Sequence, residues 1–405
     1  MSTSYRITSQ KMETTTLNRA EKLSDSRHSL YEAPNSARAV EGQLASSINQ
    51  RYEWASETII PYLLERSKEF QRITELRQMG WNNPEGDAFF QKQRRTADEC
   101  NDSTAAYFYE LMQNIGQELH QATNAFAIQQ HHVQGPNIFD MCMAPGGFLA
   151  MALINNPGTG ALAFSLPVSS GGHKVLLQTP SDVEQRFLDI TMLAADMGVK
   201  EIPEDHPDAD HFLPRQFEPD QLFDLVLCDG QVLRTHARAE YREKREARRL
   251  TITQLALGLE HLRSGGTMVV LLHKLEAWDT VNLLWTFHKF SSVRVFKPKM
   301  GHAKRSSFYL VATNIQSRHA QAVKAIDNWK KMWRVATFGS DEEYQRTLCD
   351  GEISVEELLE DFGPELVELG REIWKVQADA LAKAPFIRDR KRVSSSRWRV
   401  STVPR

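Results

Sequence analysis

Two acidic residues and a glycine-rich turn stand at the ends of apolar runs, where side chains could act on a ligand. The first run begins at Ile138, passes Asp140 and leads into the turn at 144–147 (APGG), after which Phe148 opens a helical stretch. Glycine in such a turn lets a ligand approach the backbone, and the helix start offers N–H groups to an anionic group. The alternative interpretation is a plain structural turn. The turn is not G-x-G-x-x-G, which disfavours a dinucleotide-dependent oxidoreductase.

Asp229 ends a second apolar run, Phe223–Cys228, and precedes Gly230. An acid in this position is expected to project from the carboxyl edge of a sheet, where ligands bind in open α/β folds. The alternative interpretation is an aspartate that only caps a turn.

These residues lie in a region, 131–315, where short apolar runs alternate with helical stretches. Continuous apolar strands separated by helices indicate an α/β fold with a mostly parallel sheet covered on both faces, and the last two strands suggest one antiparallel strand near the end. A long helical pattern is predicted over Arg238–Leu262, stopping at Gly265 and Gly266. The expected strands are Ile138–Met143, Ala161–Leu166, Ile190–Ala194, Phe223–Cys228, Thr267–Leu272, Ser292–Phe296 and Ser307–Thr313.

The flanking regions have a different pattern. Residues 46–130 and 316–384 show helical spacing of apolar residues, and they could cover the sheet, shape a substrate groove or form a surface for a protein partner or a homodimer. Residues 1–45 are rich in Ser and Thr with few apolar residues, which predicts disorder. Residues 385–405 form a basic tail.

The composition argues against a disulfide-stabilised protein, a cysteine-based zinc protein and a membrane protein. The formal net charge is −3, so binding of nucleic acid would require local basic patches. The 4 cysteines are scattered, which argues against disulfides and against a cysteine-based zinc site. The sequence has neither an apolar stretch of membrane-spanning length nor a secretory signal, so we expect no membrane contact and a nuclear or cytoplasmic protein.

The string Asp140-x-x-x-Ala144-Pro145-Gly146-Gly147-Phe148 resembles the D-x-x-A-A-P-G-G-[WF] motif of the FtsJ-like ribose 2′-O-methyltransferases. This resemblance implies a Rossmann-like class I methyltransferase sheet, with S-adenosylmethionine as the cofactor and no metal. In the family the loop holds the methionine end of the cofactor and an acid after the third strand lies near the adenine. The second strand, Ala161–Leu166, offers no ribose-binding acid. The implied cofactor-binding residues are Asp140, Ala144, Pro145, Gly146, Gly147, Phe148, Asp196 and Asp229.

A second resemblance lies in Phe296-Lys297-Pro298 and Tyr309-Leu310-Val311, which keep the spacing of the family motif F-K-P-x-x-S-R-x-x-S-x-E-x-Y-x-V. The family tetrad implies catalytic roles for Asp229, for Lys274, which lies three residues beyond the usual lysine position, and for Ser307, which replaces the glutamate. The family's first lysine is missing from the matching segment Ala105–Tyr109. In the same motif, Gly301, His302 and Arg305 replace a serine, an arginine and a second serine of the family. Conceivable substitutes for the missing catalytic groups are Tyr109, His302 and Lys304.

The implied reaction is methyl transfer to an RNA ribose hydroxyl, in which a lysine held between carboxylates orients the hydroxyl and takes up its proton. Basic residues near the same edge could contact RNA phosphates, although interleaved glutamates also fit a solvated helix. A catalytically inactive protein that binds RNA or a protein partner is the alternative, and an oxidoreductase is a distant third. The candidate RNA-binding residues are Arg234, Arg238, Arg242, Lys304 and Arg305.

Overall fold

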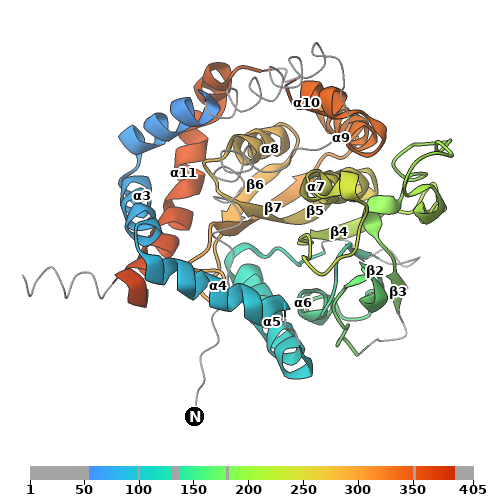
Figure 1. Ribbon diagram of the computed structural model, residues 1–405, viewed down its shortest axis with the longest axis horizontal. Helices are drawn as coiled ribbons and strands as arrows, with labels where there is room; N and C mark the ends of the chain where they lie inside the picture. The colour runs from blue at the N-terminus through green and yellow to red at the C-terminus, as the bar shows by residue number, and fades with distance from the viewer. Residues whose placement is uncertain (1–53, 99–100, 129–136, 179–181, 350–352, 388–405) are drawn as a thin grey trace, which may run out of the picture.

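Seven strands form one sheet in the order β3-β2-β1-β4-β5-β7-β6 (Figure 1). The computed structural model describes residues 54–98, 101–128, 137–178, 182–349 and 353–387. All neighbouring strands pair in parallel except that β7 is antiparallel to both β5 and β6. The expected α/β fold is therefore confirmed. The strands are β1 Ile138–Asp140, β2 Ala161–Ser165, β3 Val183–Phe187, β4 Phe223–Cys228, β5 Leu262–His273, β6 Ser292–Phe296 and β7 Ser307–Ile315.

The prediction of the third strand was wrong. The strand is Val183–Phe187, and the apolar run expected as a strand at Ile190–Ala194 begins with a 3-10 turn, Ile190–Met192. Asp189 starts that turn by accepting the Thr191 N–H. β3 lies at the edge of the sheet and has one buried side chain, Val183, so its sequence lacks the continuous apolar character of a central strand.

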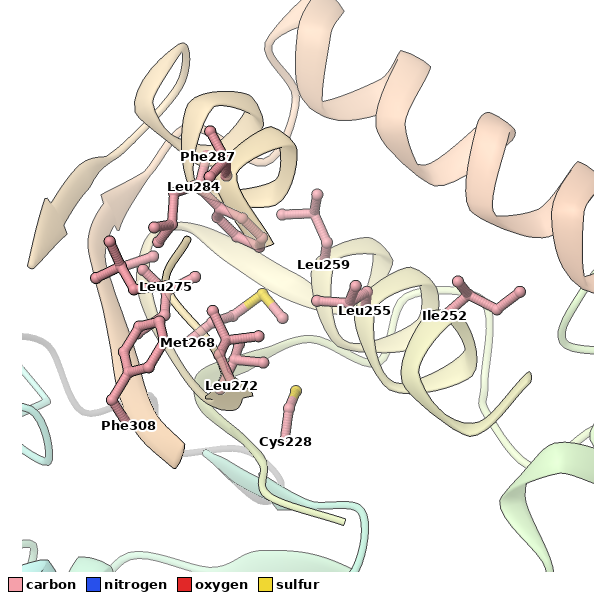
Figure 2. Close-up of a cluster of buried hydrophobic side chains, with 14 of the residues drawn as sticks. Cys228, Ile252, Leu255, Leu259, Met268, Leu272, Leu275, Leu284, Phe287 and Phe308 are labelled. Atoms are coloured by element: carbon pink, nitrogen blue, oxygen red, sulfur yellow. The ribbon is translucent and has the colours of Figure 1, made fainter. Parts of the chain in front are cut away.

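The two faces of the sheet bury alternate residues of each strand. In β4, Val226 and Cys228 join one core, whereas Leu225 and Leu227 join the other. Figure 2 shows the first core, where Leu255 of α7 and Leu284 of α8 meet side chains of the sheet. The period of two residues explains why the buried parts of the central strands carry apolar residues on both faces.

The helices form a layer on each face (Figure 1). α5 (Asp102–Thr123) and α6 (Gly147–Ile154) cover one face, and α7 (Glu246–Glu260) and α8 (Trp278–His288) cover the other. The helix expected over Arg238–Leu262 is shorter, because a 3-10 turn at Glu240–Arg242 precedes it and β5 already begins at Leu262. Gly265, with φ of 90°, lies inside β5 near a shift in its pairing with β4.

Helices from both flanks pack side by side and extend the first core. Phe70 of α3 contacts Trp374 of α11, with ring centroids 4.9 Å apart. α11 starts at a capping box in which Ser354 and Glu357 bond to each other's backbone N–H. Residues 54–66 are also helical. The flanking helices are α3 Lys68–Trp81, α4 Pro84–Asp98, α9 Ala320–Phe338, α10 Asp341–Cys349 and α11 Val355–Ala382.

Some expectations concern residues outside those that the structure describes. The segment 1–45 and most of the basic tail at 385–405 belong to this group, so the disorder predicted for 1–45 stays a prediction. Among the described helices, none combines the length and the apolar character that crossing a bilayer requires.

Candidate methyl-transfer site

The glycine turn follows β1 at the carboxyl edge of the sheet. The side chain of Asp140, the last residue of β1, accepts the Cys142 N–H at 3.1 Å and so begins the turn. The Ala144–Pro145 peptide is cis, and Gly146 has a φ of 106°. This positive φ is open to glycine at little cost, which explains glycine at the start of α6.

The second glycine serves packing within the protein. A Cβ added to Gly147 would overlap the carbonyl oxygen of Tyr109 in α5, and one added to Gly146 would lie 2.8 Å from Cβ of Leu177. The Leu176 N–H also donates to Pro145 O at 2.9 Å. Because Gly146 and Gly147 have no side chains, α5 and the segment after β2 can approach the turn. This packing is a second reason for glycine here, in addition to the expected approach of a ligand.

Asp140 and Asp229 form a pair of acids at the ends of the neighbouring strands β1 and β4. Burial raises the pKa of Asp140 well above its usual value, and the charge of Asp229 adds to this rise. Burial raises the pKa of Asp229 to about 7. The Oδ2 atom of Asp140 is buried and makes no hydrogen bond within the described residues. A cationic ligand would relieve both effects, and S-adenosylmethionine carries an ammonium and a sulfonium, so these residues fit it.

Lys274 stands directly after β5, which ends at His273. It has a φ of 47°, and its N–H donates to Ser306 O at 3.2 Å. The strand has ended before Lys274, so the alternation of strand faces does not decide where its side chain points. Ser307 pairs with His273 in the β5–β7 register, which places Lys274 and Ser307 at the same edge as Asp229.

Ser307 differs from the glutamate of the family motif in charge and reach. Its side chain is buried, and Oγ makes no hydrogen bond within the described residues. A buried hydroxyl without a partner is costly unless something else satisfies it, such as a ligand or water. Ser307 can donate or accept a hydrogen bond, but it cannot balance the charge of Lys274.

Tyr309 lies at the centre of an aromatic group beside the acids. Its buried ring stacks on Phe148 of α6, with centroids 5.4 Å apart, and lies nearly parallel to His302, with centroids 6.4 Å apart. Burial raises the pKa of the Tyr309 phenol, the charge of Asp229 raises it further, and the charge of Arg305 lowers it. The phenol thus lies within electrostatic reach of both charges. The sequence marks Tyr309 only by its spacing in the motif and carries no sign of its place beside Asp229 and Arg305.

Arg305 supplies a positive charge close to the site. Burial lowers the pKa of its guanidinium to about 9, so it stays charged at neutral pH. Its charge also lowers the pKa of Tyr107 in α5, a phenol whose pKa burial raises. The His302 pKa is lowered well below its usual value by burial and then by Arg305, so His302 is neutral. A cation therefore stands near the segment Ala105–Tyr109, where the family lysine is missing.

Lys297 holds the loop between β6 and β7. Its side chain is buried, and Nζ donates to the carbonyl oxygens of His302 (2.9 Å), Arg305 and Ser307 (2.5 Å). This explains the lysine in Phe296-Lys297-Pro298, since three donors on one ammonium can satisfy three converging carbonyls. The sequence marks the position by its spacing, but it carries no sign of these partners.

Asp196, the acid expected near the adenine, is committed to the backbone. Its carboxylate accepts the N–H groups of Gln216 (3.0 Å) and Phe217 (3.4 Å) and so caps the backbone of that segment. Asp189 lies closer to the end of β3, but it bonds Arg242 at 2.6 Å. The cofactor contact of Asp196 stays a prediction, and neither acid has a carboxylate that is free of protein partners.

Arg242 does not support the expected contact with RNA, because it is buried among acids. Its Nη2 donates to Asp189 and to Glu246, both at 2.6 Å. Asp189, His236 and Glu246 gather as metal ligands could, but the Arg242 guanidinium already balances the two carboxylates. This cluster links the segment after β3 to the start of α7.

The other predicted RNA contacts differ in exposure. Arg238 bonds the carbonyl oxygens of Leu233 and His236 and the Glu243 carboxylate, which leaves its guanidinium little freedom. Lys304 and Arg305 are half-buried, whereas Arg234 is exposed. Arg234 is therefore the predicted RNA-binding residue with the most accessible side chain.

Among the comparisons with known proteins, the family match agrees with this geometry. The FtsJ-like methyltransferase family matches residues 117–315. No curated protein matches the chain. A Plasmodium falciparum protein described as a ribosomal RNA methyltransferase is 16% identical, with a TM-score of 0.32, over 50% of this chain and 97% of that one. Human methyltransferase-like protein 13 in complex with SAH is 10% identical, with a TM-score of 0.27, over 63% and 96%.

An O-methyltransferase family protein from Burkholderia thailandensis is 14% identical, with a TM-score of 0.29, over 60% of this chain and 72% of that chain. The family match spans both motifs and all the strands, including the acid pair at the ends of β1 and β4. Residues 117–315 therefore form an S-adenosylmethionine-dependent methyltransferase domain of the FtsJ-like family.

Proposed function

We propose that this domain transfers a methyl group from S-adenosylmethionine to a ribose 2′-hydroxyl of RNA. The observation that carries the proposal is the position of Asp229. It lies beside Asp140 at the carboxyl edge, and burial raises its pKa to about 7. With a cation bound beside it, Asp229 would be ionised at neutral pH, and its carboxylate could then accept a proton from a reacting hydroxyl.

Each of the site residues would have its own role in this reaction. The bound cofactor supplies an electrophilic methyl group on a sulfonium. Asp140 and the turn 144–148 would hold its methionine end, while Asp229 accepts the proton of the attacking hydroxyl. Lys274 and Arg305 would stabilise the negative charge that develops on that oxygen. Ser307 would replace the family carboxylate as a neutral hydrogen-bonding group.

RNA is favoured as the substrate by the two sequence resemblances and by Arg234. Arg234 is exposed and follows Asp229 by five positions on the segment after β4. An exposed arginine next to a sheet edge that holds the reacting groups suits a phosphate contact. Arg234→Ala is expected to weaken RNA binding and to leave cofactor binding unchanged.

The test combines cofactor binding with a product assay. Calorimetric titration measures binding of S-adenosylmethionine to the full chain and to Asp140→Asn. Methyl transfer from labelled cofactor to total RNA is followed by alkaline hydrolysis, because a 2′-O-methyl group protects the adjoining phosphodiester. Asp229→Ala should abolish the protected product, and Asp220→Ala, an exposed aspartate upstream of β4, is the matched control. Label that alkali-labile nucleotides carry would refute the ribose assignment.

A catalytically silent RNA-binding protein is the second candidate. The observation that favours it is the neutral Ser307 at the position of the family glutamate, together with a segment Ala105–Tyr109 that lacks lysine. In that case the full chain would bind the cofactor or RNA without transferring label. Transfer that depends on Asp229 excludes this candidate.

A further inference from the structure

A line of hydrogen bonds, one of them buried and two part-buried, runs from the flanking helices to two loops of the site. Arg77 of α3 donates through Nη1 to Glu276 at 2.5 Å and through Nη2 to Gln377 of α11 at 2.9 Å. Gln377 in turn donates through Nε2 to the carbonyl oxygen of Lys304 at 3.4 Å. We call these four residues the relay.

Within the relay, Arg77 and Gln377 are buried, whereas Glu276 and Lys304 are half-buried. The side chains of Arg77 and Glu276 are 8% and 10% exposed, and Gln377 is 1% exposed. Glu276 Oε2 makes no hydrogen bond within the described residues, so Arg77 supplies the hydrogen bond that this carboxylate receives through Oε1. A buried ion pair often adds little stability compared with apolar residues, and fixing one geometry is among its best supported uses.

Both loops that the relay reaches carry residues of the proposed reaction. Glu276 lies two positions after Lys274, in the loop between β5 and α8. Lys304 precedes Arg305 and Ser307, in the loop between β6 and β7. The two loops also touch directly, because the Lys274 N–H donates to Ser306 O. A displacement of either loop would therefore change where the cations stand relative to Asp229.

The planar guanidinium explains why an arginine stands at this point. Its two Nη groups donate in fixed directions, so one side chain sets Glu276 and Gln377 relative to each other. The helices behind it are held together by the contact between Phe70 and Trp374. α3 and α11 thus form a firm support on which the two loops are set.

We propose, building on the methyl-transfer function above, that Arg77 and Gln377 are positioning residues for this site. Through Glu276 and Lys304 they fix the two loops that carry Lys274 and Arg305. The helical flanks are then part of the catalytic unit, in addition to any role in binding a partner.

The first experiment measures hydrogen exchange of the full chain. In Arg77→Lys, a single ammonium cannot reproduce the two directed donors of the guanidinium. The backbone amides of both loops, 274–277 and 298–306, should therefore exchange roughly tenfold faster. In Gln377→Glu, the donor to Lys304 is lost but an acceptor for Arg77 remains, so the change should be confined to 298–306. Arg72→Lys is the matched control, because Arg72 joins α3 to Asp379 at the surface without reaching either loop. Unchanged exchange in both loops of Arg77→Lys overturns the proposal.

The second experiment separates positioning from general stability. In Arg77→Lys and Gln377→Glu, kcat for methyl transfer should fall roughly tenfold while the calorimetric Kd for S-adenosylmethionine stays within about twofold. Faster loop exchange with an unchanged kcat contradicts the positioning role. If the wild-type chain transfers no methyl group, the proposed function fails, whereas the exchange data still show whether the relay holds the loops.

Discussion

Replacing Lys297 with methionine removes the ammonium that holds the loop before β7 and keeps most of the side-chain volume. Three carbonyl oxygens then lose a charge-assisted hydrogen bond. The Ser307 carbonyl belongs to a buried residue and cannot regain water easily, which costs about 1–3 kcal/mol. The carbonyls of His302 and Arg305 belong to half-buried residues and can be rehydrated, at about 0.5–1 kcal/mol each.

The sum is about 3 kcal/mol, since burying the ammonium itself carries a desolvation cost that methionine avoids. An unfolding entropy of about 2.1 cal/mol/K per residue, taken over 405 residues, gives about 0.85 kcal/mol/K. Lys297→Met should therefore lower Tm by about 3–4 °C in differential scanning calorimetry. Lys299→Met, at an exposed neighbouring lysine, should shift Tm by less than about 1 °C. Equal melting of the two variants would refute the role assigned to Lys297.

Three further outcomes follow from the site. Asp229→Asn should raise Tm at pH 8 more than at pH 5. The folded pKa of Asp229 is about 7, above its usual value, so the wild-type protein loses stability as the pH rises toward 7. A difference in Tm that does not depend on pH contradicts this. Binding of S-adenosylmethionine at pH 7 should release protons, because a cation lowers the pKa values of Asp140 and Asp229. Calorimetric titrations in two buffers of different ionisation enthalpy measure this proton release. No proton release would mean that the cation binds elsewhere. Gly147→Ala should lower the free energy of unfolding in urea by about 1–3 kcal/mol, because the added Cβ overlaps the Tyr109 carbonyl. Gly158→Ala has open space around it and should lower the free energy of unfolding by about 1 kcal/mol.

Sequence patterns predicted the apolar strands better than the polar edge strand β3. The central strand Phe223–Cys228 and the other edge strand, Ser292–Phe296, match the structure at both ends. β3, by contrast, was not predicted, because four of the five positions in Val183–Phe187 are polar or exposed. The segment becomes a strand through its parallel pairing with β2. Local composition carries the signal of a strand with several apolar residues, such as β6, but not the signal of a mostly polar strand with one buried residue, such as β3.

The site shows a similar division. The positions of Asp140 and Asp229 follow from the ends of apolar runs, and Phe296-Lys297-Pro298 follows from motif spacing. The roles of single basic residues do not, because Arg242 and Arg234 look alike in the sequence, and only the fold buries one among acids and leaves the other exposed. The same holds for Asp196, whose backbone partners lie 20 and 21 positions away.

The sequence by itself determined the α/β architecture, the glycine turn after the first strand and the acids at the strand ends, since these depend on local periodicity and on residues close together in the chain. Only the tertiary structure decided the surroundings of Tyr309, the three partners of Lys297 and the contact of Arg77 with Glu276, 199 positions away. Hydrogen bonds and charge pairs between distant segments depend on distances of a few ångströms, and the packing of the sheet against its helices sets those distances.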